Sequence, residues 1–114
     1  MTRGLRTVIY PVKDLDQAKT LYGHLLGAAP TMDEPWYVQF SLGDQEIGLD
    51  PRGHGQGMTG PVGYWHVDDI KASYDQLLDA GATARQPITD VGGGRQIATL
   101  TDPDGNVIGL LQPS

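Results

Sequence analysis

The sequence contains two copies of one pattern. A shift of 55 positions places Val12-Lys13-Asp14-Leu15 on Val67-Asp68-Asp69-Ile70, and each stretch ends an apolar run. Ile47-Gly48-Leu49 matches Ile108-Gly109-Leu110 at a shift of 61, so the second copy has a longer turn. Because one copy is too small to bury a core alone, the two copies must pair, either within the chain or by exchange with a second chain.

Each copy is predicted to begin with a strand and a helix. Thr7–Val12 and Gly63–Val67 have the composition of strands. Asp14 and Asp69 are placed to cap the following helices, which Gly27 and Gly81 end. Both helices carry an apolar stripe, which in the first consists of Leu15, Ala18, Leu21, Tyr22, Leu25 and Leu26.

Strands with alternating polarity follow each helix. Trp36–Leu42 and Glu46–Asp50 form such a pair in the first copy, and Gln96–Thr101 and Val107–Gln112 in the second. Pro51–Pro61 is rich in glycine and is predicted to be a flexible connector. The chain is therefore expected to be a single α+β domain of two βαβββ modules, with module one at 1–52, the connector at 53–60 and module two at 61–114.

Composition excludes several classes of protein. The 114 residues include no Cys, which excludes disulfide scaffolds and thiol catalysis, and this favours a cytoplasmic protein. No apolar run is long enough to span a membrane, and a net charge of −6 with scattered basic residues disfavours nucleic acid. The acidic residues are expected mainly to form a solvated surface, and their charge would also attract a cationic small molecule.

The βαβββ repeat, the Val-x-Asp-[Leu/Ile] helix starts and the stretch Asp102-Pro103-Asp104-Gly105-Asn106-Val107-Ile108 together resemble the vicinal oxygen chelate superfamily. This superfamily contains glyoxalase I, extradiol dioxygenases, epimerases, fosfomycin-resistance enzymes and bleomycin-resistance proteins. The resemblance implies two modules whose mixed sheets curve around a cavity, with the helices on the outer face, and a homodimer.

The resemblance also implies where a metal ion would be held in metal-dependent members. Those positions, on the first and last strand of each module, correspond to Thr7, Gly48, Val62 and Gly109. None of the four is a suitable ligand, so we expect a member without a metal ion or other cofactor. Small residues there either leave room for an organic ligand held by shape, or make room for neighbouring side chains.

Strand alternation predicts which other side chains share a face with these four positions. They are Ile9, Tyr37, Gln39, Glu46, Asp50, Tyr64, His66, Val107 and Leu111. Side chains of the opposite parity, Trp65 among them, are expected beneath the helices. Gly92-Gly93-Gly94 is predicted to be a tight hairpin, and Arg95 after it would reach an anionic group.

His66 has two interpretations. Its imidazole suits proton transfer, and it could instead be a local partner of the helix cap at Asp69.

The candidate ligand-binding set is therefore Thr7, Ile9, Tyr37, Gln39, Gly48, Asp50, Val62, Tyr64, His66, Arg95 and Gly109. The first hypothesis is a metal-independent protein that binds a small aromatic or cationic molecule, such as an antibiotic. The second is a glyoxalase-type lyase or isomerase, or a dioxygenase, with metal ligands elsewhere. A partner module without ligand chemistry is the third.

Overall fold

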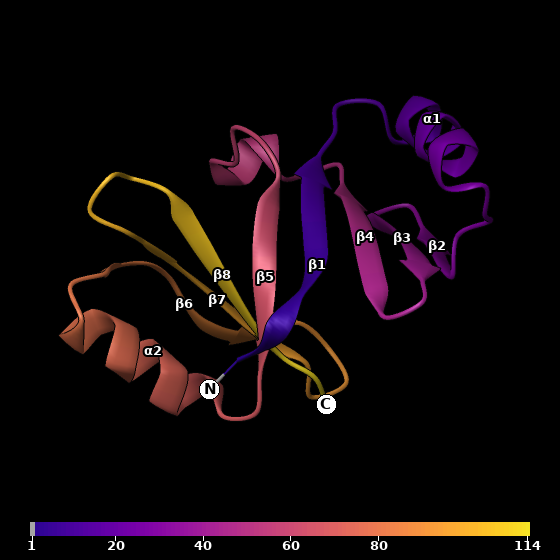
Figure 1. The fold of residues 1–114 in the computed structure, drawn as a ribbon. Coiled ribbons are helices and arrows are strands. Elements are labelled where there is room, and N and C mark those ends of the chain that lie inside the picture. Colours follow the sequence, from indigo (N-terminus) through magenta and orange to yellow (C-terminus); the bar gives the residue numbers. More distant parts are fainter. Residues whose placement is uncertain (1) are drawn as a thin grey trace. The chain divides into compact units, whose positions relative to one another are not determined.

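The computed structural model describes residues 2–114, which form two compact units (Figure 1). The N-terminal unit is Arg6–Val62, and the C-terminal unit is Gly63–Ser114 together with residues 2–5. Each unit contains one helix and a four-stranded mixed sheet, which confirms the α+β class and the two βαβββ modules. The first strand begins at Thr2, five residues earlier than predicted.

In the N-terminal unit the strand order is β2-β3-β4-β1. The bounds are β1 Thr2–Pro11, α1 Leu15–Leu26, β2 Met32–Glu34, β3 Tyr37–Leu42 and β4 Gln45–Asp50. Strand β1 runs parallel to β4, whereas β2 and β3 are antiparallel to their neighbours. The short edge strand β2 is the third strand that the predicted βαβββ module requires after its helix, although no residue range was predicted for it.

In the C-terminal unit the order is β5-β8-β7-β6. The bounds are β5 Val62–Val67, α2 Ile70–Asp79, β6 Thr83–Asp90, β7 Gln96–Thr101 and β8 Val107–Gln112. Here too the first strand, β5, runs parallel to the last, β8. Both β7 and β8 have the predicted bounds.

The strand register confirms the repeat. Gly48 pairs with Ile9 in one unit, and Gly109 pairs with Tyr64 in the other. Ile9 and Tyr64 differ by the 55 positions of the first sequence match, and Gly48 and Gly109 by the 61 of the last. Gly48 and Gly109 are therefore equivalent in structure as well as in sequence, and so are Ile9 and Tyr64.

Both helices begin at the predicted aspartates. Asp14 and Asp69 have extended backbones, and each carboxylate accepts a hydrogen bond from the backbone amide three residues later. Gly27 ends α1 in the left-handed conformation, at φ 63°. Ala80, rather than Gly81, caps α2.

Each helix packs on one face of its own sheet. Ala18 of α1 contacts a buried cluster of Val38, Phe40 and Leu49, and Ile70 of α2 joins Val67, Ala98, Leu100 and Leu110. Tyr10, Ile47 and Leu49 lie on the α1 side, as the alternation predicted. Neither helix of residues 2–114 is long and apolar enough to cross a membrane.

Several apolar side chains expected in the core are exposed, Leu78 of α2 among them. Leu21 and Leu25 are 65% and 74% exposed, because they lie to one side of the stripe formed by Leu15, Ala18, Tyr22 and Leu26. Trp65 is 39% exposed, although Val67 of the same parity in β5 is buried in the α2 cluster. The predictions for these residues were wrong.

The segment predicted to be a flexible connector contains a defined turn. A 3-10 helix, η1, spans His54–Gln56, and the backbone amide of Met58 donates to the carbonyl of Gly53. Gly53 is buried against Pro11, where an added Cβ would lie 2.7 Å from the Pro11 Cβ. Close approach of β1 therefore requires glycine at this position.

Candidate functional sites

The N-terminal unit presents a polar sheet face on the side opposite α1. Val38 and Phe40 are buried under the helix. Tyr37 and Gln39 alternate with them along β3, so their side chains point to the other face. The register places Thr7 beside Glu46, Ile9 beside Gly48, and Pro11 beside Asp50. Six members of the predicted ligand-binding set therefore share this face: Thr7, Ile9, Tyr37, Gln39, Gly48 and Asp50.

A carboxylate is held in a defined position on this face. The Thr7 hydroxyl donates to Glu46 Oε1 at 2.7 Å, and the Gln39 amide donates to Glu46 Oε2 at 3.3 Å. Thr7 is completely buried, so its hydroxyl holds Glu46 from below the surface. The predicted ligand-binding set omitted Glu46, although strand alternation predicted it on this face. Its two hydrogen bonds depend on how β4 pairs with β1 and β3, which the sequence alone does not reveal.

Tyr37 occupies the space above Gly48. A Cβ added to Gly48 would lie 2.0 Å from the Tyr37 hydroxyl oxygen and 2.7 Å from Cζ. The ring end thus lies where a side chain at position 48 would be. This favours the second of the two interpretations of Gly48, in which glycine makes room for a neighbouring side chain.

The C-terminal unit has a corresponding face on the side opposite α2. Thr99, Gly109 and Tyr64 lie in one row across β7, β8 and β5, and Ile97, Leu111 and His66 form another row. Thr99 and His66 are buried, at 1% and 9% exposure. Sequence analysis found Tyr64, His66 and Gly109 but missed Thr99, because nothing in a run of Thr and Leu singles out one hydroxyl.

Gly109 is also covered by a tyrosine, but by atoms nearer the backbone. An added Cβ would lie 2.6 Å from Tyr64 Cδ1 and 2.7 Å from the carbonyl oxygen of Gly63. Here the obstruction includes backbone as well as the base of an aromatic ring. A tyrosine therefore covers the last-strand glycine in both units, although Tyr37 comes from an antiparallel neighbour and Tyr64 from a parallel one.

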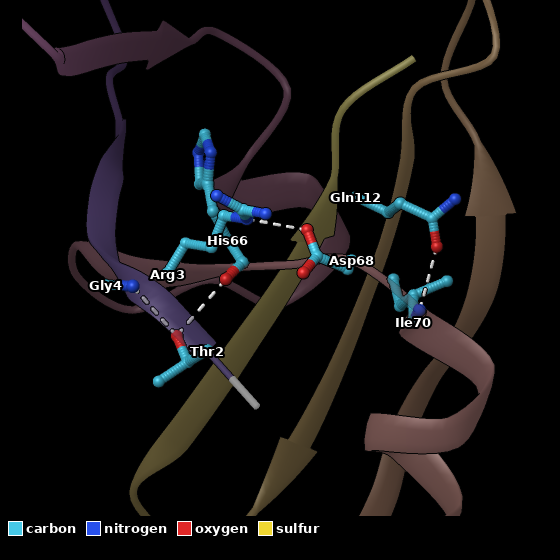
Figure 2. Close-up of polar contacts among 7 residues, drawn as sticks. All are labelled: Thr2, Arg3, Gly4, His66, Asp68, Ile70 and Gln112. Atoms are coloured by element: carbon cyan, nitrogen blue, oxygen red, sulfur yellow. Dashed lines mark hydrogen bonds and ion pairs between the residues drawn. The ribbon is translucent and has the colours of Figure 1, made fainter.

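The His66 imidazole is oriented away from the start of α2 (Figure 2). Asp69 accepts from Ala72, and the Gln112 side-chain oxygen accepts from the Ile70 amide at 2.8 Å. Figure 2 shows the imidazole of His66 pointing away from Asp68 and the start of α2, while its backbone carbonyl accepts from the Thr2 hydroxyl. The structure thus favours the sheet face over the helix cap as the surroundings of this imidazole.

Thr2 and Arg3 form hydrogen bonds with the end of β5 and the residue after it, His66 and Asp68. Arg3 Nε donates to Asp68 Oδ1 at 2.7 Å (Figure 2), and this bond lowers the pKa of the Asp68 carboxyl. The early start of β1 follows from these contacts, which join residues more than sixty positions apart.

The remaining candidates lie in loops or at strand ends. The Asp50 carboxylate accepts from the Arg52 backbone amide at 2.9 Å. Val62 is buried at the start of β5. Arg95 follows the predicted hairpin, which is confirmed by the hydrogen bond from the Val91 amide to the Arg95 carbonyl and by positive φ angles at all three glycines.

The residues at the four metal positions do not fit a metal ion. Gly48, Val62 and Gly109 have no side-chain donor, and the Thr7 hydroxyl donates to Glu46. Across residues 2–114, no cluster of three or more His, Cys, Asp or Glu side chains could hold a metal ion. No step of a reaction is therefore assigned to a metal ion at these positions.

Several solved structures have the same fold. A methylmalonyl-CoA epimerase from Streptomyces coelicolor superposes with a TM-score of 0.75 at 16% identity, covering 100% of this chain and 99% of that one. A Mn(II)-bound glyoxalase from Novosphingobium aromaticivorans has a TM-score of 0.71 at 19% identity, covering 97% of this chain and 39% of that one. At such identities the likeness concerns the fold alone.

Curated relatives match part of the chain. The putative glyoxylase CFP32 of Mycobacterium bovis and of Mycobacterium tuberculosis is 35% identical over 49 residues, which is 43% of this chain. The chain spans about a fifth, 19%, of the length of these relatives. The model of the Glyoxalase/Bleomycin resistance protein/Dioxygenase superfamily matches residues 4–110, which include both modules, and the chain belongs to this superfamily.

Proposed function

We propose that this protein binds a small organic molecule, cationic and partly aromatic, without a divalent metal ion. The observation that carries the proposal is the replacement of metal ligands in both units. Gly48 and Gly109 stand at the last-strand positions, and tyrosine rings cover them. A face with aromatic rings and no donor cluster suits recognition by stacking and shape.

Glu46 supports the cationic part of the proposal. Thr7 and Gln39 donate hydrogen bonds that fix the position of its carboxylate. Tyr37 lies on the same face, and an aromatic ring beside a carboxylate is favourable for an organic cation. The net charge of −6 adds a long-range attraction for cations.

Calorimetry on the full chain tests this function. Metal-free bleomycin and simple aromatic ammonium compounds are titrated into protein treated with a chelator, and saturable heats are expected. Glu46→Gln should weaken binding about tenfold, since it removes a charge-assisted contact. Asp16→Asn is the control because it removes the same charge from α1, which packs on the opposite face of the sheet. Flat heats with every compound would refute the proposal.

The alternative is an enzyme, either a glyoxalase-type lyase or isomerase or a dioxygenase. The specific observation in its favour is a positioned carboxylate at Glu46, which could act as a general base without a metal ion. Relatives of the same fold include an epimerase and a glyoxalase. Turnover of a superfamily substrate that Glu46→Gln abolishes, or one bound Ni, Zn, Mn or Fe per chain, would favour this alternative.

We also propose that the protein is a homodimer. Leu21, Leu25 and Trp36 are each more than half exposed in the single chain, an exposure that subunit association would reduce. Light scattering should give twice the 12.3 kDa mass of one chain. A mass of one chain at micromolar concentration would contradict the dimer.

A further inference from the structure

Methionine is the only sulfur-containing residue type in the sequence. The chain has three methionines and no cysteine. Oxidation of sulfur can therefore take place only at methionine, where a peroxide converts the thioether to a sulfoxide. Two of the methionines lie in the described part of the chain. Met32 in β2 is 41% exposed, whereas Met58 in the connector is partly buried.

Met58 closes the turn of the connector in two ways. Its backbone amide donates to the Gly53 carbonyl at 3.0 Å, and the Gly53 amide donates to the Asp50 carbonyl at 3.2 Å. The side chain folds back over the same residue, because Met58 Sδ lies 2.9 Å from the position of a Cβ added to Gly53. The thioether therefore packs directly against the Gly53 backbone, next to the hydrogen bond that its own amide makes.

Pro11 of β1 completes this apolar contact. Its Cβ lies 2.7 Å from the same added Cβ position, and it pairs with Asp50 at the end of β4. Gly53 is buried, although residues 54–57 are exposed. Packing of the connector against β1 thus depends largely on the contact that Gly53 makes with Pro11 and with the Met58 thioether.

We propose that Met58 is a reversible oxidation site and that its oxidation opens the connector turn. The sulfur attacks one oxygen of hydrogen peroxide and the oxygen–oxygen bond breaks. The thioether loses two electrons and becomes a sulfoxide, and the peroxide is reduced to water. A sulfoxide reductase reverses the step with two thiols, which form a disulfide while the oxygen leaves as water.

The sulfoxide does not suit the place that the thioether occupies. It is polar and carries an additional oxygen atom, whereas Pro11 and Gly53 offer no hydrogen bond donor from their side chains. The oxidised side chain should therefore leave this contact for water. The defined turn then becomes the flexible connector that its glycine content favours. This inference goes beyond the proposed function and does not depend on which ligand the protein binds.

The expected effect is local and modest. Loss of an apolar contact equal to one buried methylene group changes an opening equilibrium about fourfold. The turn lies at the surface and can open without separating the strands of the sheet. Faster hydrogen exchange should therefore be confined to the connector amides, and the amides of Phe40 and Leu49 in the buried cluster should keep their rates.

Hydrogen exchange of the full, isotope-labelled chain, measured before and after treatment with hydrogen peroxide, tests the inference. Peptide mass spectrometry identifies which methionine carries the added oxygen. Once Met58 is a sulfoxide, the amides of Gly53 and Met58 should exchange about fourfold faster. Treatment with methionine sulfoxide reductase and dithiothreitol should restore the original rates.

Two leucine variants provide the controls. Met58→Leu keeps an apolar side chain of similar size but has no sulfur, so peroxide should leave its connector unchanged. Met32→Leu removes the more exposed methionine and should retain the whole response to peroxide.

Three results would overturn the inference. They are unchanged exchange in protein whose Met58 is fully oxidised, the same acceleration by peroxide in Met58→Leu, and an unmodified Met58 under conditions that oxidise Met32 completely. Each result concerns the connector alone, so it leaves the proposed ligand binding in place. Flat heats in the ligand titrations would in turn leave the oxidation site in place.

Discussion

The glycines covered by tyrosine should respond differently to alanine. At Gly109 an added Cβ would lie 2.7 Å from the Gly63 carbonyl oxygen and 2.8 Å from Tyr64 Cγ. The Gly63 oxygen can move only if the β5 backbone moves, and Tyr64 Cγ can move only if the whole ring changes rotamer. Overpacking of this kind destabilises a protein by ~1–3 kcal/mol, and loss of glycine freedom in the unfolded chain returns ~0.4–1 kcal/mol. Gly109→Ala should therefore destabilise the fold by a net ~1–2 kcal/mol.

Gly48→Ala should be milder. The nearest atoms belong to the far end of the Tyr37 ring, at 2.0 Å for the hydroxyl oxygen and 3.0 Å for Cε1. This ring can swing away from the sheet, so we expect a loss of about 1 kcal/mol or less. Gly48 has no positive φ angle that would add strain.

Urea unfolding measures both effects, provided that the slope of free energy against urea is unchanged. Tyr37→Leu should relieve the obstruction, so that Gly48→Ala becomes neutral in that background. Tyr64→Leu should not rescue Gly109→Ala, because the Gly63 oxygen remains in place. The reasoning is refuted if Gly109→Ala is as stable as the wild type, or if Gly48→Ala is the more damaging change.

Three further predictions concern stability. Gln112→Ala should destabilise the C-terminal unit by about 1–2 kcal/mol, because the partly buried Ile70 amide loses its acceptor, and urea unfolding measures this. Asp69→Ala should cost about 1 kcal/mol through loss of the α2 cap, with Asp69→Asn as the milder control. Hydrogen bonds from Asn106 lower the pKa of Asp102, so its contribution is present above the unfolded pKa and is lost as the pH falls through the folded value. The free energy of unfolding should therefore decline below about pH 4, and less steeply in Asp102→Asn; equal pH profiles would contradict this assignment.

Local signals predicted most of the fold. Asp14 and Asp69 marked both helix starts because an N-cap depends on a few neighbouring residues. The Asp102–Asn106 turn fixed the facing ends of β7 and β8, since its aspartate accepts from the amides of Asp104 and Asn106. Alternation then assigned the correct face to Tyr37, Gln39 and Glu46.

Features that depend on distant pairing could not be predicted. The extension of β1 to Thr2 depends on contacts with His66 and Asp68. A β-bulge at Arg85 follows from the register of β6 against β7, which no local pattern encodes. Trp65 has the same alternation as Val67, and no local pattern distinguishes the exposed residue from the buried one.

Metal content measured together with ligand binding tests the central claim most directly. Protein purified from cells grown with added Ni, Zn, Mn and Fe is analysed for these elements, and the same sample is titrated with ligand before and after chelation. Far less than one ion per chain, and identical ligand affinities, are predicted. One tightly bound ion per chain, or binding that chelation abolishes and metal restores, would contradict metal-independent recognition.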